Sequence, residues 1–150
     1  MPQPEPPDPV SMPALLRHAL VTYGGAMRAA LAKAGYDDIP KNGLYVIGGL
    51  ALAGDHPLGG LIDQLRLSKQ AAGQLVDTLV ERGYLQRNVD AEDRRRLTIA
   101  LSSRGRAAAK VQGAARVRID EVLTARVGER NVESARRALI ALIQIGRELK

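Results

Sequence analysis

Residues 67–105 decide the fold of this chain, and they read LSKQAAGQLVDTLVERGYLQRNVDAEDRRRLTIALSSRG. In the first part of this stretch, apolar residues recur at helical spacing and form one stripe: Ala72, Leu75, Val76 and Leu79. Ser68 stands before the stripe, where its hydroxyl oxygen suits an N-cap, and Gly83 follows it as a typical helix end. We therefore predict a helix that begins at Ser68 and ends at Gly83.

Two short strands are predicted after this helix, because the apolar residues change to the alternating pattern of a strand. The alternating positions carry Leu85, Arg87 and Val89 in the first strand and Leu97, Ile99 and Leu101 in the second. The connection over 90–95 is polar and charged. The sequence therefore predicts a hairpin with a charged tip.

The segment before Ser68 predicts a second helix, which precedes the helix that begins at Ser68. Residues 58–65 have the pattern of a helix of about two turns, and Arg66 and Leu67 separate it from the Ser68 helix. Two helices joined by a tight turn form a helix-turn-helix. With the hairpin that follows, this order predicts a winged helix-turn-helix.

A further helix is predicted over 40–54, since Pro40 suits a first helical turn and Gly54 suits a helix end. Its inward positions are expected to be Leu44, Ile47 and Ala51. Its glycines weaken a helix, and we interpret them as places of close helix packing: Gly43, Gly48 and Gly49. His56, beside Pro57, is interpreted as a turn residue.

Long helices are predicted at both ends of the chain. The first, over about 13–35, follows a Pro-rich arm over 1–12 that we expect to be disordered. Its apolar stripe is Leu16, Leu20, Tyr23, Met27, Leu31 and Ala34. Two more helices are predicted from about Ser102 to Val127 and from Asn131, as N-cap, to the C-terminus. Their apolar positions are Val111, Ala115, Val122, Ala135, Leu139, Leu142 and Leu149.

The predicted fold class is mostly α with a small β-hairpin wing. A winged helix-turn-helix lobe over about 40–101 is expected between dimerisation helices over about 13–35 and 103–150, all in a single domain over 13–150. The terminal helices carry more apolar surface than a compact lobe can bury by itself. We therefore expect the chain to associate with a second copy.

Composition favours a nucleic-acid partner over an enzyme. The net charge is +6, and seven arginines lie between Arg82 and Arg106. The chain has no Cys, which excludes disulfides, thiolate metal sites and cysteine nucleophiles. His18 and His56 are isolated, and no Gly-rich phosphate loop follows a strand, so we expect no enzyme, no metal site and no cofactor. No apolar run approaches the roughly 18 residues of a membrane span, and we expect a cytoplasmic protein with no membrane contact.

The helix predicted from Ser68 carries a polar face that suits the major groove of DNA. Gln70 and Gln74 lie one turn apart on this face, and a Gln side chain pairs with N6 and N7 of adenine. Ser68 and Lys69 stand at the positive end of the helix dipole, which favours phosphate. Gly73, between the two glutamines, allows a close approach to the bases.

The predicted hairpin tip carries Arg94, Arg95 and Arg96, which suit a minor groove of high negative potential. Arg95 is the first candidate for insertion. Asp93 is interpreted as orienting a neighbouring Arg, because phosphates repel a carboxylate. With Arg87 of the first strand, the candidate DNA-binding set is Ser68, Lys69, Gln70, Gly73, Gln74, Arg87, Arg94, Arg95 and Arg96.

Several motifs in this stretch resemble the MarR family of transcriptional regulators. They are the recognition-helix pattern over 67–85, the Asp-x-Arg wing signature at Asp93 and Arg95, and the Leu-Ser-x-x-Gly helix entry at 101–105. The resemblance implies a homodimer whose terminal helices interlock and whose two lobes read double-stranded DNA at a pseudo-palindromic operator. It also implies a repressor that is released by a small-molecule effector, bound between the dimerisation helices and the lobe. It assigns no effector-binding residue in this chain.

Two alternatives stay open beside a sequence-specific regulator. One is an architectural protein that binds DNA without sequence preference, and the other is a winged-helix module that binds another protein. A charged tip or a pair of glutamines alone is usually a solvated surface. Their order in a basic chain, an Arg-tipped hairpin directly after a helix-turn-helix, favours DNA reading. A footprint on DNA would distinguish the three.

Overall fold

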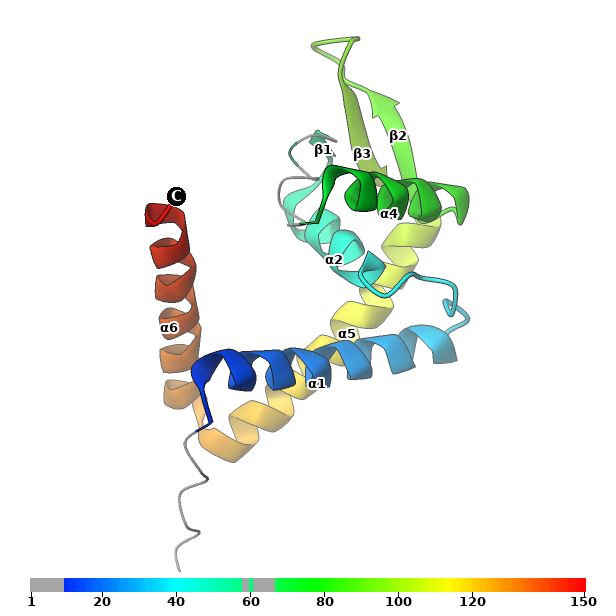
Figure 1. The fold of residues 1–150 in the computed structure, drawn as a ribbon. Coiled ribbons are helices and arrows are strands. Elements are labelled where there is room, and N and C mark those ends of the chain that lie inside the picture. The colour runs from blue at the N-terminus through cyan, green and yellow to red at the C-terminus, as the bar shows by residue number, and fades with distance from the viewer. Residues whose placement is uncertain (1–9, 58–59, 61–66) are drawn as a thin grey trace, which may run out of the picture. The chain divides into compact units, whose positions relative to one another are not determined.

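The computed structural model describes residues 10–57, 60 and 67–150 (Figure 1). In chain order the elements are α1 (Met12–Lys33), α2 (Gly43–Ala53), β1 (His56–Pro57), α4 (Lys69–Glu81), β2 (Leu85–Val89), β3 (Leu97–Leu101), α5 (Ser103–Val127) and α6 (Glu129–Glu148). Most of the predicted arm over 1–12 and of the predicted helix over 58–65 lies outside the described residues. The predicted mostly α fold with a small β-hairpin is confirmed.

The chain divides into two compact units within α5. The first ends at Ala115 and holds α1, α2, α4, the three strands and the first half of α5. The second begins at Arg116 and holds the rest of α5 with α6. All candidate DNA-binding residues belong to the first unit.

An aliphatic core holds the first unit together. Its most deeply buried side chains come from α1, α2, α4 and the sheet: Leu31, Leu44, Val46, Ile47, Val76, Leu79, Tyr84 and Ile99. Burying each such side chain contributes about 1.5–3 kcal/mol relative to leaving it in water. The core therefore fixes α4 and the hairpin within one rigid lobe.

Local signals at both ends of α4 act as the sequence predicts. The Ser68 hydroxyl oxygen accepts a hydrogen bond from the Ala71 N–H at 3.1 Å. At the other end Gly83 has a φ of +83°, and the N–H of Tyr84 donates to the Leu79 carbonyl at 2.9 Å. The predicted inward stripe of Ala72, Leu75, Val76 and Leu79 is buried.

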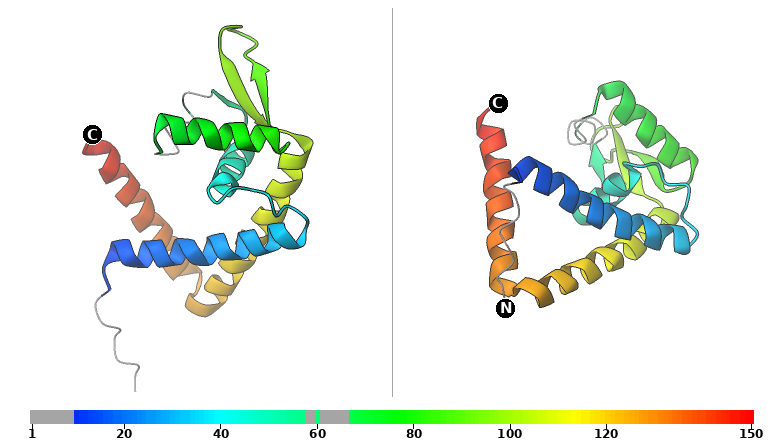
Figure 2. Two further views of the ribbon diagram at one scale, coloured as in Figure 1. Left: turned by 45° about the vertical axis from the view of Figure 1, so that its right-hand side comes forward. Right: turned by 60° about the horizontal axis from the view of Figure 1, so that its bottom comes forward.

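Strands β2 and β3 form the predicted antiparallel hairpin, in the register Leu85↔Leu101, Arg87↔Ile99 and Val89↔Leu97. Figure 2 shows this hairpin projecting beyond α4. Only its base is buried, because Val89 and Leu97 near the free end are exposed. The prediction of apolar faces is therefore confirmed for the base of the hairpin and wrong for its outer half.

The prediction that His56 is a turn residue is wrong. His56 and Pro57 form β1, which pairs antiparallel with Ile99 and Thr98 and gives a sheet of order β1-β3-β2. Pro57 lacks an N–H and so suits such an edge strand. The pairing is made with residues far along the chain, and no local pattern around His56 reveals it.

Helix α2 begins at Gly43, three residues later than predicted from Pro40. Pro40 instead begins a turn, since its carbonyl accepts the N–H of Gly43 at 2.8 Å. The prediction that Ala51 faces inward is wrong: Ala51 is exposed, and Leu50 is buried in its place. A one-position difference on a helix turns a residue by about a quarter of a turn, enough to move it out of the core.

The interpretation of the α2 glycines as packing sites holds at two of the three. A Cβ on Gly43 would lie 3.0 Å from Leu79 Cδ2, and a Cβ on Gly48 would lie 3.0 Å from Gln112 Nε2. Around Gly49 nothing lies within 4 Å of such an atom. Gly43 and Gly48 therefore allow α4 and α5 to approach α2 closely.

Helix α1 begins after Ser11, whose hydroxyl oxygen accepts the N–H of Ala14 at 3.4 Å. From its predicted stripe, Met27 and Leu31 are buried in the core, whereas Leu20 is exposed. The C-terminal half of α1 thus belongs to the core of the first unit, and apolar side chains of its N-terminal half remain uncovered.

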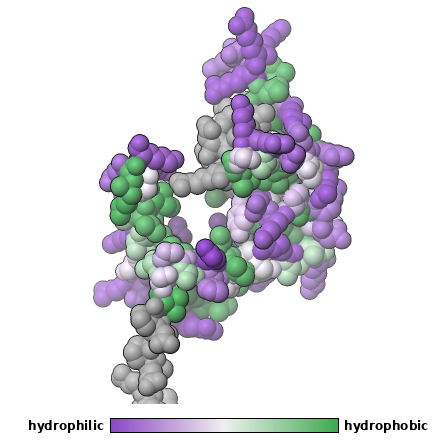
Figure 3. Space-filling model, in the orientation of Figure 1, coloured by the Kyte–Doolittle hydropathy of each residue, from purple (hydrophilic) through white to green (hydrophobic). Residues whose placement is uncertain are grey.

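In the second unit, α6 has no buried residue. Its N-cap is Gly128, not Asn131 as predicted, because Gly128 takes the positive φ of 84° at the junction with α5. Asn131 lies inside the helix and its side-chain amide donates to the Val127 carbonyl at 2.9 Å. Exposed apolar side chains run along α6 and its C-cap (Figure 3): Leu139, Ile140, Leu142, Ile143, Ile145 and Leu149.

Candidate DNA-binding surface

The outward face of α4 and the tip of the hairpin form the candidate DNA-binding surface. On α4, Lys69, Gln70 and Gln74 are on the side opposite the buried stripe, with the N-cap Ser68 beside them. Gly73 lies between the glutamines, and a Cβ built there would meet nothing within 4 Å. This face is therefore flat at its centre and polar on either side.

Two carboxylates shape the tip of the hairpin, which we call the wing (90–96). The Asp93 carboxylate accepts the backbone N–H of Arg95 at 3.0 Å, and the Asp90 carboxylate accepts that of Glu92 at 2.9 Å. The backbone N–H of Asp90 also donates to the Arg96 carbonyl at 2.9 Å. Asp93 thus holds the backbone of Arg95 in place, in the orienting role assigned to it from the sequence.

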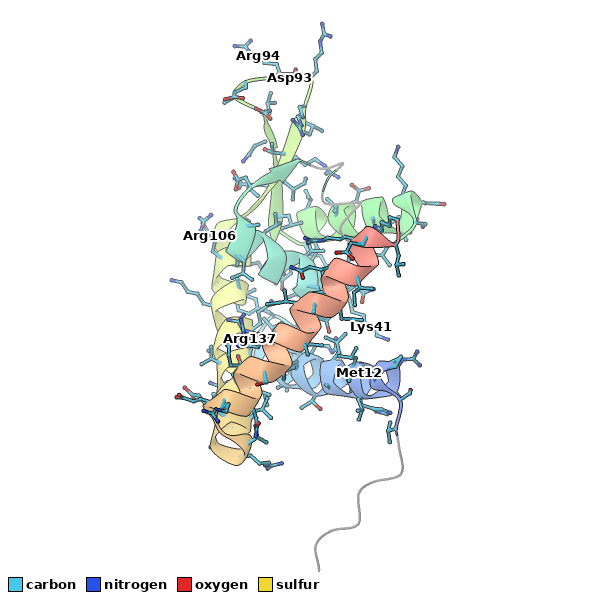
Figure 4. All side chains as sticks on the ribbon, turned by 90° about the vertical axis from the view of Figure 1, so that its left-hand side faces the viewer. Met12, Lys41, Asp93, Arg94, Arg106 and Arg137 are labelled. Carbon is cyan, nitrogen blue, oxygen red and sulfur yellow. The ribbon has the colours of Figure 1, made fainter. Side chains whose placement is uncertain are left out.

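The guanidinium groups of the wing point into solvent. Arg94, Arg95 and Arg96 are exposed, and within the described residues none of the three forms an ion pair, with Asp93 or any other carboxylate. Figure 4 shows Asp93 and Arg94 at the free end of the hairpin. Three unneutralised cations on one projecting tip favour contact with a polyanion.

Arg87 has a partner that the sequence analysis missed. Its guanidinium forms an ion pair with the Asp77 carboxylate of α4, so it connects β2 to the outward face of the helix. Arg87 occupies a position of the strand where the pattern is otherwise apolar. An Arg at such a position needs a partner on the element that the strand faces, but the sequence pattern does not say which residue supplies it.

A second polar cluster, also missed, lies where α4, β2 and α5 meet. The buried Tyr84 donates its hydroxyl hydrogen to the Asp38 carboxylate. Arg104 lies 3.2 Å from Asp38 Oδ1, and its guanidinium carbon lies 4.5 Å from the centroid of the Tyr84 ring. These three residues, which we call the Asp38 cluster, tie the loop before α2 to the corner between α4 and β2.

Charge and burial in the Asp38 cluster shift two pKa values. Burial and the hydrogen bond to Asp38 raise the pKa of Tyr84 to about 12. The hydrogen bond from Tyr84, and next the positive charge of Arg104, lower the pKa of Asp38. At neutral pH the cluster therefore holds a neutral phenol, a carboxylate and a guanidinium, each hydrogen-bonded to the others.

The first turn of α5 is fixed to the same corner. A Cβ on Gly105 would lie 2.0 Å from the Tyr84 carbonyl oxygen, so only glycine allows this approach. The Ser102 hydroxyl accepts the Gly105 N–H at 3.0 Å, which places Ser102 as the helix start predicted from the sequence. The corner thus sets the directions of α4, the wing and the start of α5 together.

The described part of the chain holds neither a metal-ligand cluster nor a membrane-spanning helix. No group of three acidic or His side chains there could hold a metal ion. None of the helices described is both long enough and apolar enough to cross a membrane.

Part of this lobe is similar to a known protein family. The model of the MarR family matches residues 38–96. The structure of FabT from Streptococcus pneumoniae in complex with DNA superposes with a TM-score of 0.75 at 18% identity, covering 91% of this chain and 95% of that one. NadR in complex with 4-hydroxyphenylacetate gives a TM-score of 0.73 at 18% identity, over 93% of this chain and 97% of that one.

A probable transcriptional regulator from Pseudomonas aeruginosa is 26% identical, with a TM-score of 0.63 over 88% of this chain and 96% of that one. Comparison with curated protein sequences gives no match. The family model spans α4 and the wing, and the shared fold extends over most of the chain. Over residues 38–96 the chain is therefore similar to the MarR family, and its fold matches that of these solved structures.

Proposed function

We propose that this protein is a repressor that binds a pseudo-palindromic DNA operator as a homodimer and is released by a small-molecule effector, with no catalytic activity of its own. The observation that carries the proposal is the combination of a polar, open face on α4 with an unneutralised arginine wing on the same rigid lobe. Both features suit contact with double-stranded DNA, in the major and the minor groove respectively.

The two glutamines of α4 supply base recognition in this proposal. Gln70 and Gln74 are one turn apart on the outward face, so both amides meet the same groove edge. Each amide pairs with N6 and N7 of an adenine. Ser68 and Lys69 hold phosphate at the start of the helix, and the open surface at Gly73 lets the backbone approach the bases.

The wing supplies a second contact, beside the major-groove site. Arg95 is the candidate for the minor groove because Asp93 fixes its backbone while its side chain forms no ion pair with a described residue. Arg94 and Arg96 meet phosphates on either side. This contact depends on groove width and so favours A·T-rich flanks.

Dimerisation follows from the uncovered apolar side chains of the terminal helices. Leu20 of α1 and the apolar residues of α6 are exposed in the protomer, and such surface is normally covered in a stable protein. A two-fold dimer presents two α4 helices and two wings, which matches an operator made of two inverted half-sites. The FabT structure, which contains DNA, supports DNA binding by a protein of the same fold.

Release by an effector is supported by the structure of NadR, which contains 4-hydroxyphenylacetate. In this chain the effector is expected to bind between the dimerisation helices and the lobe. Such an effector would bind more tightly to a dimer whose two lobes are not spaced to fit the operator. Effector binding then lowers the affinity for the operator, and DNA binding lowers the affinity for the effector by the same factor.

The test is selection of bound sites from random DNA with the full-length protein, followed by footprinting. A short protected palindrome supports the proposal. Uniform protection identifies a non-specific architectural protein, and no protection identifies a protein-interaction module. With the selected site in hand, Gln70→Ala and Gln74→Ala should each weaken binding by about 1–3 kcal/mol and relax base preference at particular positions.

The same site serves to find the effector. A panel of small aromatic and acidic compounds, including 4-hydroxyphenylacetate, is added to the complex of protein and operator. Release by one compound, at a concentration that leaves the fold of the protein unchanged, supports the repressor mechanism. If no compound releases the operator, the effector part of the proposal is lost while the DNA-binding part stands.

A further inference from the structure

The outward stripe of α4 continues past the glutamines to a carboxylate. Gln70, Gln74 and Asp77 are spaced four and three residues apart, so they lie along one face of the helix. The Asp77 side chain is 67% exposed. A carboxylate here is unexpected, because phosphate groups repel a negative charge on a surface that approaches DNA.

Arg87 neutralises this carboxylate from the hairpin. Its Nη2 bonds Asp77 Oδ1, and its side chain is only 35% exposed. Arg87 pairs across the hairpin with the buried Ile99, so it leaves β2 on the face that packs on α4. The core therefore holds the guanidinium beside α4, not out in solvent as for Arg94.

The pair leaves one carboxylate oxygen available. Within the described residues, the hydrogen bond from Arg87 goes to Oδ1 of Asp77, and Oδ2 accepts no hydrogen bond. In the major groove a carboxylate accepts a hydrogen bond from the exocyclic N4 amine of cytosine. The positive charge of Arg87 lowers the repulsion between this carboxylate and phosphate. The second oxygen can still accept a hydrogen bond in the groove.

We propose that Asp77 is a specificity-determining residue that reads a cytosine, and that Arg87 is a positioning residue that holds its carboxylate. This proposal rests on the proposed DNA-reading function of α4. It predicts a C·G base pair next to the position that Gln74 reads in each half-site. Arg87 then contributes to DNA binding through Asp77, without a phosphate contact of its own.

Site selection with two variants tests the role of Asp77. The wild-type protein should prefer cytosine at one position by roughly tenfold over other bases. Asp77→Asn should change that preference to adenine, because an amide pairs with adenine N6 and N7 and still accepts from Arg87. Asp77→Ala should remove the preference at that position only. A wild-type site without this C·G pair, or an Asp77→Asn protein that selects the wild-type site, overturns the proposal.

Glu81→Gln is the matched control, since it removes an exposed carboxylate one turn further along the same helix. It should leave the cytosine preference unchanged, even if the affinity for all DNA rises with the loss of negative charge. A loss of the preference in Glu81→Gln would mean that helix charge, not Asp77, sets it, and would overturn the proposal.

Arg87→Ala separates positioning from phosphate contact. If Arg87 is a positioning residue, Arg87→Ala should weaken the cytosine preference and leave the slope of log K against log salt unchanged. Removal of a phosphate-binding cation would instead make that slope shallower by about 0.9. Arg87→Lys, which keeps a donor, should recover part of the preference. A shallower slope with the preference intact overturns the role of Arg87. If the wild-type protein selects no site at all, the proposed function fails first, which distinguishes the two failures.

Discussion

If α4 enters the major groove as proposed, helix stability and the approach of DNA favour different residues at Gly73. It lies in the interior of α4, where glycine costs about 0.5–1 kcal/mol relative to alanine. A Cβ would meet nothing within 4 Å in the free protein. Packing within the protein therefore does not require glycine here, and a close approach of DNA to the helix gives a reason for it.

We expect Gly73→Ala to stabilise the protein by about 0.5–1 kcal/mol in urea unfolding while it weakens operator binding at least severalfold. The methyl group fills the space that the bases need. Gly49→Ala is the matched control, since Gly49 lies in the interior of α2 and is equally open. It should stabilise the protein without an effect on operator affinity. Equal or tighter operator binding by Gly73→Ala would contradict the proposed approach of α4.

The Asp38 cluster predicts how the free energy of unfolding depends on pH. The pKa of Tyr84 is raised in the folded state, from 10.0 to about 12, so this group favours folding below pH 10 and loses that contribution as the pH rises toward 12. The pKa of Asp38 is lowered, so its contribution is present above its ordinary value of 3.8 and is lost as the pH falls through the lower folded-state value.

In urea unfolding between about pH 10 and 12, the wild-type protein should lose up to about 1.4 kcal/mol per pH unit from Tyr84. Tyr84→Phe should lower the stability at neutral pH but show a smaller alkaline loss. Tyr45→Phe removes a tyrosine hydroxyl outside the cluster and should keep the wild-type slope. An identical slope in Tyr84→Phe would exclude Tyr84 as its source.

The wing is a preformed hairpin tip with unneutralised cations. Its backbone is held by Asp90 and Asp93, so little ordering is needed when the tip meets a groove. The base of the hairpin is fixed by β1 and the core. In the proposed complex, the wing and α4 would therefore meet DNA at a set distance from one another.

Arg95→Ala should make the slope of log K against log salt shallower by about 0.9 for each phosphate that is no longer neutralised, and by twice that in a symmetric dimer. Affinity should fall most for operators with A·T-rich flanks, which have the narrowest minor groove. Lys41→Ala removes an exposed cation outside α4 and the wing and should change neither quantity. If the affinity and the slope are unchanged in Arg95→Ala, the wing does not contact DNA and its role is to stabilise the hairpin.

The exposed apolar residues of α6 predict a dimer. Leu142 is 46% exposed in the protomer, and full burial of a Leu side chain contributes about 1.5–3 kcal/mol. A dimer that buries Leu142 of both protomers therefore gains this free energy twice.

Leu142→Glu should raise the dimer dissociation constant by roughly 100-fold or more and weaken operator binding in parallel, as measured by sedimentation and gel shift. Leu52→Glu is the control, because Leu52 on α2 is even more exposed and lies outside α6. It should remain dimeric. A Leu142→Glu protein that sediments as a dimer at micromolar concentration would place the interface elsewhere.

Helix α4 and strands β2 and β3 could be predicted from the sequence, because their signals are local. The Ser68 cap, the buried stripe and the Gly83 stop depend on neighbours within a few residues. The alternating pattern of the hairpin likewise sets which residues pair across it. The outward residues of α4 follow from the inward ones, so the candidate surface could be predicted without any tertiary contact.

Contacts between residues far apart in the chain could not be predicted and are known from the structure. Tyr84 bonds Asp38, 46 residues away, and Gln112 bonds the Leu44 carbonyl, 68 residues away. The strand pairing of His56 and the Asp77–Arg87 pair arise in the same way, from how α2, α4 and the sheet pack. Such contacts depend on the positions of whole elements in the core, and periodicity along the chain carries no information about those positions.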